Sequence, residues 1–176
     1  METRAPGAPG TDDLLAEVER RLRAVPDPEI PVITIDDLGV VRDVARAGGG
    51  LRVTITPTYS GCPAMQAMAD AVLAVGRRAG VPVEVVTQLA PAWTTDWMSQ
   101  RGRDALRRFG IAPPTGERPH TSGPGAVGLT LQKRQVTCPL CGSPDTEEIA
   151  RFGSTACKAL RRCLSCREPF DEFKTI

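Results

Sequence analysis

The sequence lacks the features on which nucleic-acid-binding, membrane and secreted proteins depend. Lysine and arginine total 22 against 21 acidic residues, so no excess of positive charge attracts nucleic acid or an anionic membrane. Aromatic residues make up 4% of the chain, too few for a surface on which bases stack. No apolar run is long enough to span a bilayer, and residues 1–10 have no apolar core for a secretory signal. We therefore expect a cytoplasmic protein without nucleic-acid or membrane partners.

Side chains and motifs for catalysis are also scarce. The one histidine, His120, lies in a segment rich in proline and glycine and is not expected to bind metal. The chain has no Glu-x-x-His pair for a di-iron site, no dinucleotide fingerprint and no flavin motif. We therefore expect that the chain does not catalyse a reaction by itself.

Composition divides the chain into four parts. Residues 1–10 are predicted to be a flexible leader, and residues 11–111 an α+β domain. Residues 112–135 are rich in Pro, Gly, Ser and Thr, cannot bury much apolar surface, and are predicted to be a linker. Residues 136–176 hold five of the six cysteines and are predicted to be a zinc ribbon.

Periodicity in residues 11–111 predicts a small mixed sheet with helices on one face. A helix is expected to start at Thr11, with its hydroxyl as the cap, and to bury Leu14, Leu15, Val18 and Leu22. Alternating residues at 40–47 and 51–57 predict a hairpin, and those at 83–89 a third strand. A second helix is predicted from about residue 63 to Gly80. A third, capped by Thr94 or Thr95, is predicted to end near residue 109, with its arginines in solvent.

Two CxxC pairs in the tail predict a structural metal site. Cys138 and Cys141 are separated from Cys163 and Cys166 by residues 142–162, and two such turns complete a tetrahedron of thiolates around Zn²⁺. An iron–sulfur cluster on the same four ligands is the chemical alternative. Cys157 is the fifth thiol of this region: it either replaces one of the four or is a buried free cysteine beside them, which we favour.

The residues around these ligands predict how the module is stabilised. Its apolar residues, Ile149, Phe152, Leu160, Phe170 and Phe173, are too few for an unaided core, so metal binding is expected to supply most of the folding free energy. The net negative charge of a zinc site with four thiolates is expected to be offset by neighbouring cations. These are Lys158, Arg161, Arg162 and Arg167.

Cys62 is the candidate reactive group of the first domain. It lies between a predicted strand and a predicted helix start, where backbone N–H groups and the helix dipole are expected to lower its pKa. A thiolate there can attack, exchange or bind a soft metal. The alternative is a small buried apolar residue at a turn. Because residues 11–111 contain no histidine base, a Cys–His hydrolase is excluded.

Three segments of the first domain resemble the metal–sulfur cluster assembly family: DPEIP at 27–31, DLGVV at 37–41 and TPTYSGCP at 56–63. Together with FGSTACKAL at 152–160 and CLSCREPF at 163–170, the chain resembles the family of D subunits of bacterial phenylacetyl-CoA 1,2-epoxidase systems. The resemblance implies that Cys62 is a reactive or cluster-handling thiol, with Asp27 and Glu29 as polar residues of the neighbouring loop. It also implies a part in aerobic phenylacetate degradation.

The resemblance further implies oxygenase and reductase subunits as partners, and a homodimer is compatible with the sequence. Three hypotheses about the function remain. In the favoured one, Cys62 transiently holds iron or an iron–sulfur cluster, and the zinc ribbon docks the recipient of that metal centre. In the second hypothesis, both domains only bridge oxygenase and reductase. Under the third, the chain is a thiol enzyme acting on a CoA thioester, for which the sequence supplies no base.

Overall fold

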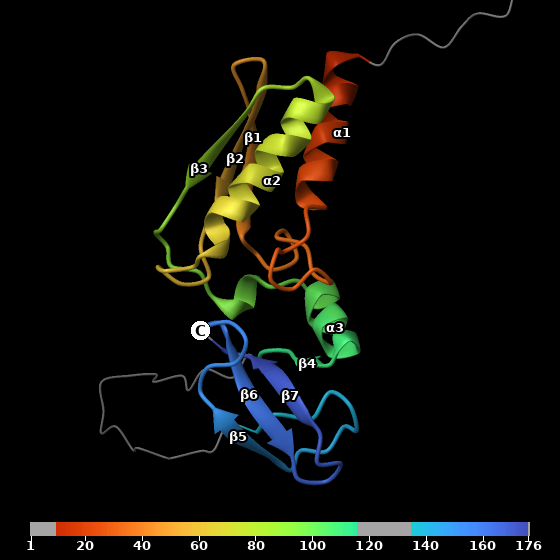
Figure 1. The fold of residues 1–176 in the computed structure, drawn as a ribbon. Helices are drawn as coiled ribbons and strands as arrows, with labels where there is room; N and C mark the ends of the chain where they lie inside the picture. The colour runs from red at the N-terminus through yellow and green to blue at the C-terminus, as the bar shows by residue number, and fades with distance from the viewer. Residues whose placement is uncertain (1–9, 116–134, 176) are drawn as a thin grey trace, which may run out of the picture. The chain divides into compact units, whose positions relative to one another are not determined.

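The computed structural model describes residues 10–115 and 135–175, which form two compact units divided between Pro91 and Ala92. The predicted leader, most of the predicted linker and His120 lie outside the described residues. Each unit has its own sheet, as Figure 1 shows, and the predicted α+β class is confirmed. No helix of the described part of the chain is long and apolar enough to cross a membrane.

The first unit is a mixed three-stranded sheet with two helices. Its elements are α1 (Thr11–Arg23), β1 (Val41–Ala47), β2 (Gly50–Ile55), α2 (Ala64–Ala79) and β3 (Val83–Thr87). The strand order is β1-β2-β3, with β1 antiparallel and β3 parallel to the central strand (Figure 1). Leu51, Val53 and Ile55 of β2 are buried, whereas Arg52 is exposed and pairs with Glu84 of β3. The alternation in β2 therefore separates core from solvent as predicted.

The helix ends of the first unit differ in detail from the prediction. Thr11 is the first residue of α1 rather than its cap, which is Gly10, and no side chain caps this helix. The buried face of α1 consists of Leu15, Val18 and Leu22, while Leu14 is 37% exposed. Leu14 lies at one edge of this stripe, because a helix rotates by about 100° per residue and Leu15 stands at the opposite edge. Gly80 ends α2 in the left-handed conformation, as predicted.

The second unit is a four-stranded sheet preceded by two short helices. Its elements are η1 (Thr95–Trp97), α3 (Gln100–Phe109), β4 (Ile111–Ala112), β5 (Thr146–Ala150), β6 (Lys158–Cys163) and β7 (Pro169–Phe173). The strand order is β4-β7-β6-β5, with β4 parallel to β7 and the other pairs antiparallel (Figure 1).

The second unit begins about twenty residues before the predicted end of the α+β domain, because β4 pairs with β7 of the ribbon. Residues 92–111 therefore belong with the ribbon. Thr94 caps η1 through Asp96 N, but the cap of α3 is Ser99, whose hydroxyl accepts from Gly102 N at 3.0 Å. The chain thus forms two short helices where the sequence suggested one.

The core of the second unit is also distributed differently from the prediction. Phe170 and Phe173 are buried as expected, but Ile149 and Phe152 are 51% and 64% exposed. Trp93, which precedes η1, takes their place in part: its ring lies 6.1 Å from the ring of Phe173. The residues before α3 therefore contribute apolar surface to a unit to which the sequence pattern had not assigned them.

Candidate metal centre and thiol site

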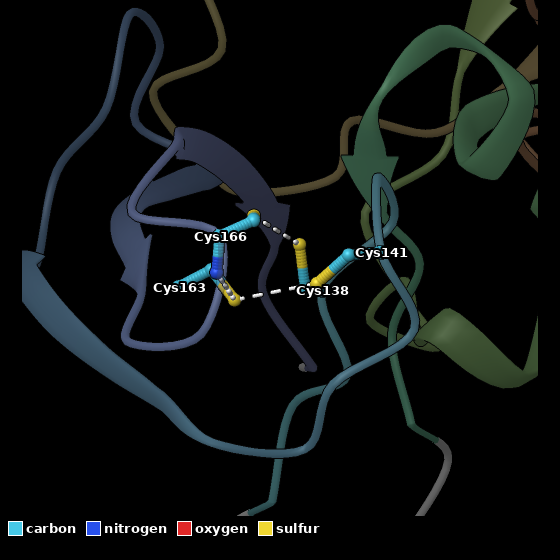
Figure 2. Close-up of side chains that lie close together, drawn as sticks. All are labelled: Cys138, Cys141, Cys163 and Cys166. Carbon is cyan, nitrogen blue, oxygen red and sulfur yellow. Dashed lines mark hydrogen bonds between the residues drawn. The ribbon is translucent and has the colours of Figure 1, made fainter.

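The four cysteines of the two CxxC pairs converge on one point in the second unit (Figure 2). Cys138 and Cys141 lie on the turn before β5, Cys163 ends β6, and Cys166 lies on the turn between β6 and β7. All four sulfur atoms lie within 4.8 Å of one another. The separation is 3.9 Å between Cys138 and Cys166 and 3.5 Å between Cys141 and Cys163.

These separations fit a single tetrahedral ion. With a zinc–sulfur bond of about 2.3 Å, the sulfur atoms of a tetrahedron are about 3.8 Å apart, close to the two separations in this site. Four thiolates fill the coordination shell of zinc and leave no position for water or substrate. The donor set and its geometry therefore favour a closed structural site for zinc over a catalytic one.

Backbone hydrogen bonds hold the turns around the site. Cys138 N donates to Ser143 O at 2.9 Å, and Gly142 N donates to Cys138 O at 2.9 Å. Cys163 Sγ accepts from Cys166 N at 3.4 Å, and this bond is the main cause that lowers the pKa of Cys163 to about 6. The pKa of Cys166 is raised to about 12, with burial and its hydrogen bonds to the other thiols as the causes that raise it, so Cys163 is the thiol of this pair that loses its proton more readily.

Cys157 lies apart from the four-cysteine cluster. It lies before β6, is buried, and is not among the four clustered cysteines. Its sulfur lies 3.0 Å from the hydroxyl of Thr155, and its carbonyl accepts from Lys174 N at 3.0 Å. The preferred interpretation, a buried cysteine outside the coordination shell, agrees with this placement.

The basic residues around the second CxxC pair interact mainly with carboxylates. Lys158 pairs with Asp171 at 3.2 Å, Arg161 with Glu172 at 3.0 Å, and Arg162 with Glu147. The carboxylates lie on the two strands next to β6: Glu147 on β5, and Asp171 and Glu172 on β7. The sequence analysis assigned no role to them. Most of the positive charge expected to offset the thiolates is therefore balanced within the sheet.

In the first unit, Cys62 lies in the loop between β2 and α2, and its thiol is about half buried. Burial is the largest influence on its pKa and raises it, and the negative charges of Glu29 and Asp27 raise it further. The N–H of Ala64 and the hydroxyl of Thr58 hydrogen-bond the sulfur and act in the opposite direction. The net effect is a raised pKa, so the prediction of a lowered one was wrong.

The carboxylates that act on Cys62 belong to the loop between α1 and β1. Asp27 is 3% exposed, and its Oδ1 accepts from the backbone N–H groups of Glu29 (2.9 Å) and Ile30 (2.7 Å). Asp27 therefore fixes the conformation of this loop, whereas Glu29 is only partly buried. The electrostatic influence of both residues on Cys62 brings together the three side chains that the resemblance had singled out.

Two threonines of the Cys62 loop were not predicted as site residues. Thr58 is 6% exposed and bonds the Cys62 thiol. Thr56 is 1% exposed, and its hydroxyl has no hydrogen-bond partner among the residues that the structure describes. The only available signal was their position within TPTYSGCP, because threonine is common in strands and turns for other reasons.

The raised pKa of Cys62 leads to a testable prediction. Replacing Glu29 with Gln removes one negative charge that disfavours the thiolate, so the pKa of Cys62 should fall and alkylation by iodoacetamide at neutral pH should become faster. The pH–rate profile of Cys62, followed by mass spectrometry, should shift to lower pH. Asp43→Asn, which removes an exposed carboxylate from β1, is the control and should leave the profile unchanged. An unshifted profile in Glu29→Gln would show that this carboxylate does not act on the thiol.

Comparison with known proteins gives matches for both units. A family model described as "PaaD zinc beta ribbon domain" matches residues 122–174, and one described as "Iron-sulfur cluster assembly protein" matches residues 15–86. The chain is 51% identical over 161 residues to the D subunit of the "Putative 1,2-phenylacetyl-CoA epoxidase" of Escherichia coli (strain K12), covering 91% of this chain and 92% of that protein.

Two further matches are restricted to part of the chain. A protein of Porphyromonas gingivalis named "Fe-S protein maturation auxiliary factor" is 38% identical over 87 residues, which cover 48% of this chain and 82% of that one. The crystal structure of a domain of unknown function, DUF59, from Bacillus anthracis is 32% identical, with a TM-score of 0.45. It covers 54% of this chain and 92% of that structure.

Proposed function

The chain belongs to the PaaD-like family, which combines an iron–sulfur cluster assembly domain with a C-terminal zinc ribbon, and we propose that it is an accessory component of a phenylacetyl-CoA 1,2-epoxidase system. The identity of 51% across 91% of the chain to the D subunit of such an epoxidase supports this role. The oxygenase and reductase subunits of that system are then its partners.

Within that system, we propose that the chain matures the iron or iron–sulfur centres of its partners. The observation that carries this proposal is the half-buried Cys62 under the influence of Glu29 and Asp27, in a unit that matches an iron–sulfur cluster assembly family. A cysteine thiolate is a ligand that suits iron and iron–sulfur clusters, and Cys62 is the one cysteine of this unit. Iron is here the cargo, while the ion in the ribbon, proposed to be zinc, stabilises the second unit.

A non-catalytic adaptor that bridges oxygenase and reductase is the second candidate. The raised pKa of Cys62 favours it, because a thiol that is mostly protonated at neutral pH is a weaker nucleophile and ligand. The adaptor requires only docking surfaces, so Cys62 would be dispensable for epoxidation. This difference separates the two candidates.

The test measures metal in the purified full-length chain, before and after anaerobic reconstitution with iron and sulfide. We expect about one zinc per chain in the wild type, in Cys62→Ala and in the control Cys157→Ala. Uptake of iron, seen as iron–sulfur absorbance, should occur in the wild type and the control but be lost in Cys62→Ala. Equal iron uptake in Cys62→Ala, together with full epoxidation by the system containing it, would favour the adaptor.

A further inference from the structure

We propose that the first CxxC turn and the end of α3 form a docking surface for an acidic segment of a partner protein that carries an apolar anchor. This surface, called the knuckle surface below, consists of Arg107, Arg108, Phe109 and Leu140 with the pocket beside them. The inference rests on the proposed role as a component of the epoxidase system and identifies where that partner would bind.

The apolar part of the knuckle surface comes from two segments that are distant in sequence. Phe109 is 58% exposed and Leu140 is 56% exposed. A methyl group placed on Gly110, which follows Phe109, would stand 3.7 Å from Cδ2 of Leu140. The end of α3 and the tip of the first CxxC turn are therefore neighbours. Exposed apolar side chains on neighbouring segments mark interaction sites more often than scattered ones do.

A pocket of about 340 Å³ is lined by Arg107 of α3 and by Pro139, the residue before Leu140 in the first CxxC turn. Its walls include Pro113, Pro114, Val136 and Pro139, and Arg107 lies at its edge. Pockets of this kind receive the anchoring side chains that dominate the affinity of protein interfaces. The three prolines and Val136 give the pocket an apolar wall against which an anchoring side chain can pack.

Positive charge lies beside this apolar centre. The α3 helix carries four arginines and one acidic residue, Asp104. Arg107 pairs with Asp104 at 3.1 Å yet its side chain remains 57% exposed, and Arg108 is exposed beside Phe109. An apolar centre with a charged rim is typical of protein interfaces, and cations on the rim select an acidic partner.

The metal site holds the knuckle surface in shape. Leu140 lies between the ligands Cys138 and Cys141, and Pro139 of the pocket lies in the same turn. A bound ion therefore fixes the position of Leu140 relative to α3. Docking at this surface should accordingly depend on the metal, although the metal itself is closed to ligands.

The test measures binding of the metal-loaded full chain to separately purified oxygenase and reductase subunits of the epoxidase system from the same bacterium. We expect the double variant Phe109→Ser, Leu140→Ser to bind its partner at least about 30-fold more weakly, as expected for loss of anchoring residues. Arg108→Glu should bind about tenfold more weakly, mainly through a slower association rate that is less sensitive to salt. Leu89→Ser is the matched control, since Leu89 is a 66% exposed leucine of the first unit, and it should bind like the wild type.

Each result of this experiment decides between named alternatives. All variants must retain their metal and the tryptophan fluorescence of the second unit, so that a loss of binding reports on the surface rather than on folding. If the knuckle variants bind as tightly as the wild type, the docking surface is overturned and the role in the epoxidase system stands. If the wild type binds neither oxygenase nor reductase, the docking surface and that role both fail, whereas iron uptake at Cys62 is measured on the isolated chain and is decided separately.

Discussion

Removal of the metal from the site with four cysteines is expected to unfold the second unit while the first unit remains folded. The buried cluster at the site comprises Ala112, Val136, Cys138, Cys163 and Phe170. Two of these five residues, Cys138 and Cys163, belong to the four-cysteine site, so this cluster loses its centre when the ion is removed. Structural zinc contributes on the order of 10 kcal/mol to the folding of such modules, more than a small domain can lose.

The two tryptophans of the chain allow the unfolding of the second unit to be measured separately from the first. Both Trp93 and Trp97 belong to the second unit, and Trp93 is 4% exposed. Chelation of the metal, or the variant Cys163→Ser, should shift the tryptophan emission to longer wavelength as Trp93 becomes exposed to water. Hydrogen exchange of β2 in the first unit should stay slow.

Cys157→Ser is the matched control for this experiment, because Cys157 is buried near the same sheet but lies outside the four-cysteine cluster. It should keep its metal and its emission spectrum. An unchanged emission in the metal-free wild type would contradict the prediction. It would show that the contacts of Trp93 and α3 stabilise the second unit without the ion.

Local patterns were sufficient to predict the elements of the first unit and to single out the four cysteines that cluster. Alternation in β2 and the glycines between β1 and β2 depend on neighbouring residues only, and so does the CxxC turn. The pairing of β4 with β7 joins residues about sixty positions apart, and nothing in residues 100–112 indicates that partner. For this reason α3 was assigned to the wrong side of the domain boundary.

The pKa shift at Cys62 and the ion pairs near the four cysteines were harder to predict than which residues form the two sites. The helix start at Cys62 does provide the N–H of Ala64, as expected, but burial and two carboxylates from another loop outweigh it. Likewise Lys158 and Arg161 lie near the metal ligands in sequence, yet their partners are Asp171 and Glu172 on the next strand. The sign of an electrostatic effect depends on tertiary neighbours, which residue spacing does not reveal.

The ion pair between Arg161 and Glu172 leads to the second prediction of large effect. Their side chains are only 6% and 2% exposed, and Nη1 of Arg161 lies 3.0 Å from Oε2 of Glu172. Arg161 also hydrogen-bonds Thr146, so its guanidinium is held within the sheet on both sides. Removing one partner of a buried pair leaves a buried charge without compensation, which costs about 3–5 kcal/mol.

Glu172→Gln should therefore lower the free energy of unfolding of the second unit by about 3 kcal/mol, the low end of that range, because Glu148 lies 4.0 Å from Arg161 and compensates in part. The neighbouring pair of Arg162 and Glu147 joins β6 to β5 rather than to β7, and its side chains are 53% and 39% exposed. Glu147→Gln is accordingly the matched control and should cost less than about 1 kcal/mol. Denaturant unfolding of the metal-loaded chain, followed by tryptophan emission, gives both values.

Equal losses of stability in the two single variants would mean that burial does not govern the strength of these pairs. Recovery of stability in the double variant Arg161→Met, Glu172→Leu would assign the loss in Glu172→Gln to the unpaired charge of Arg161.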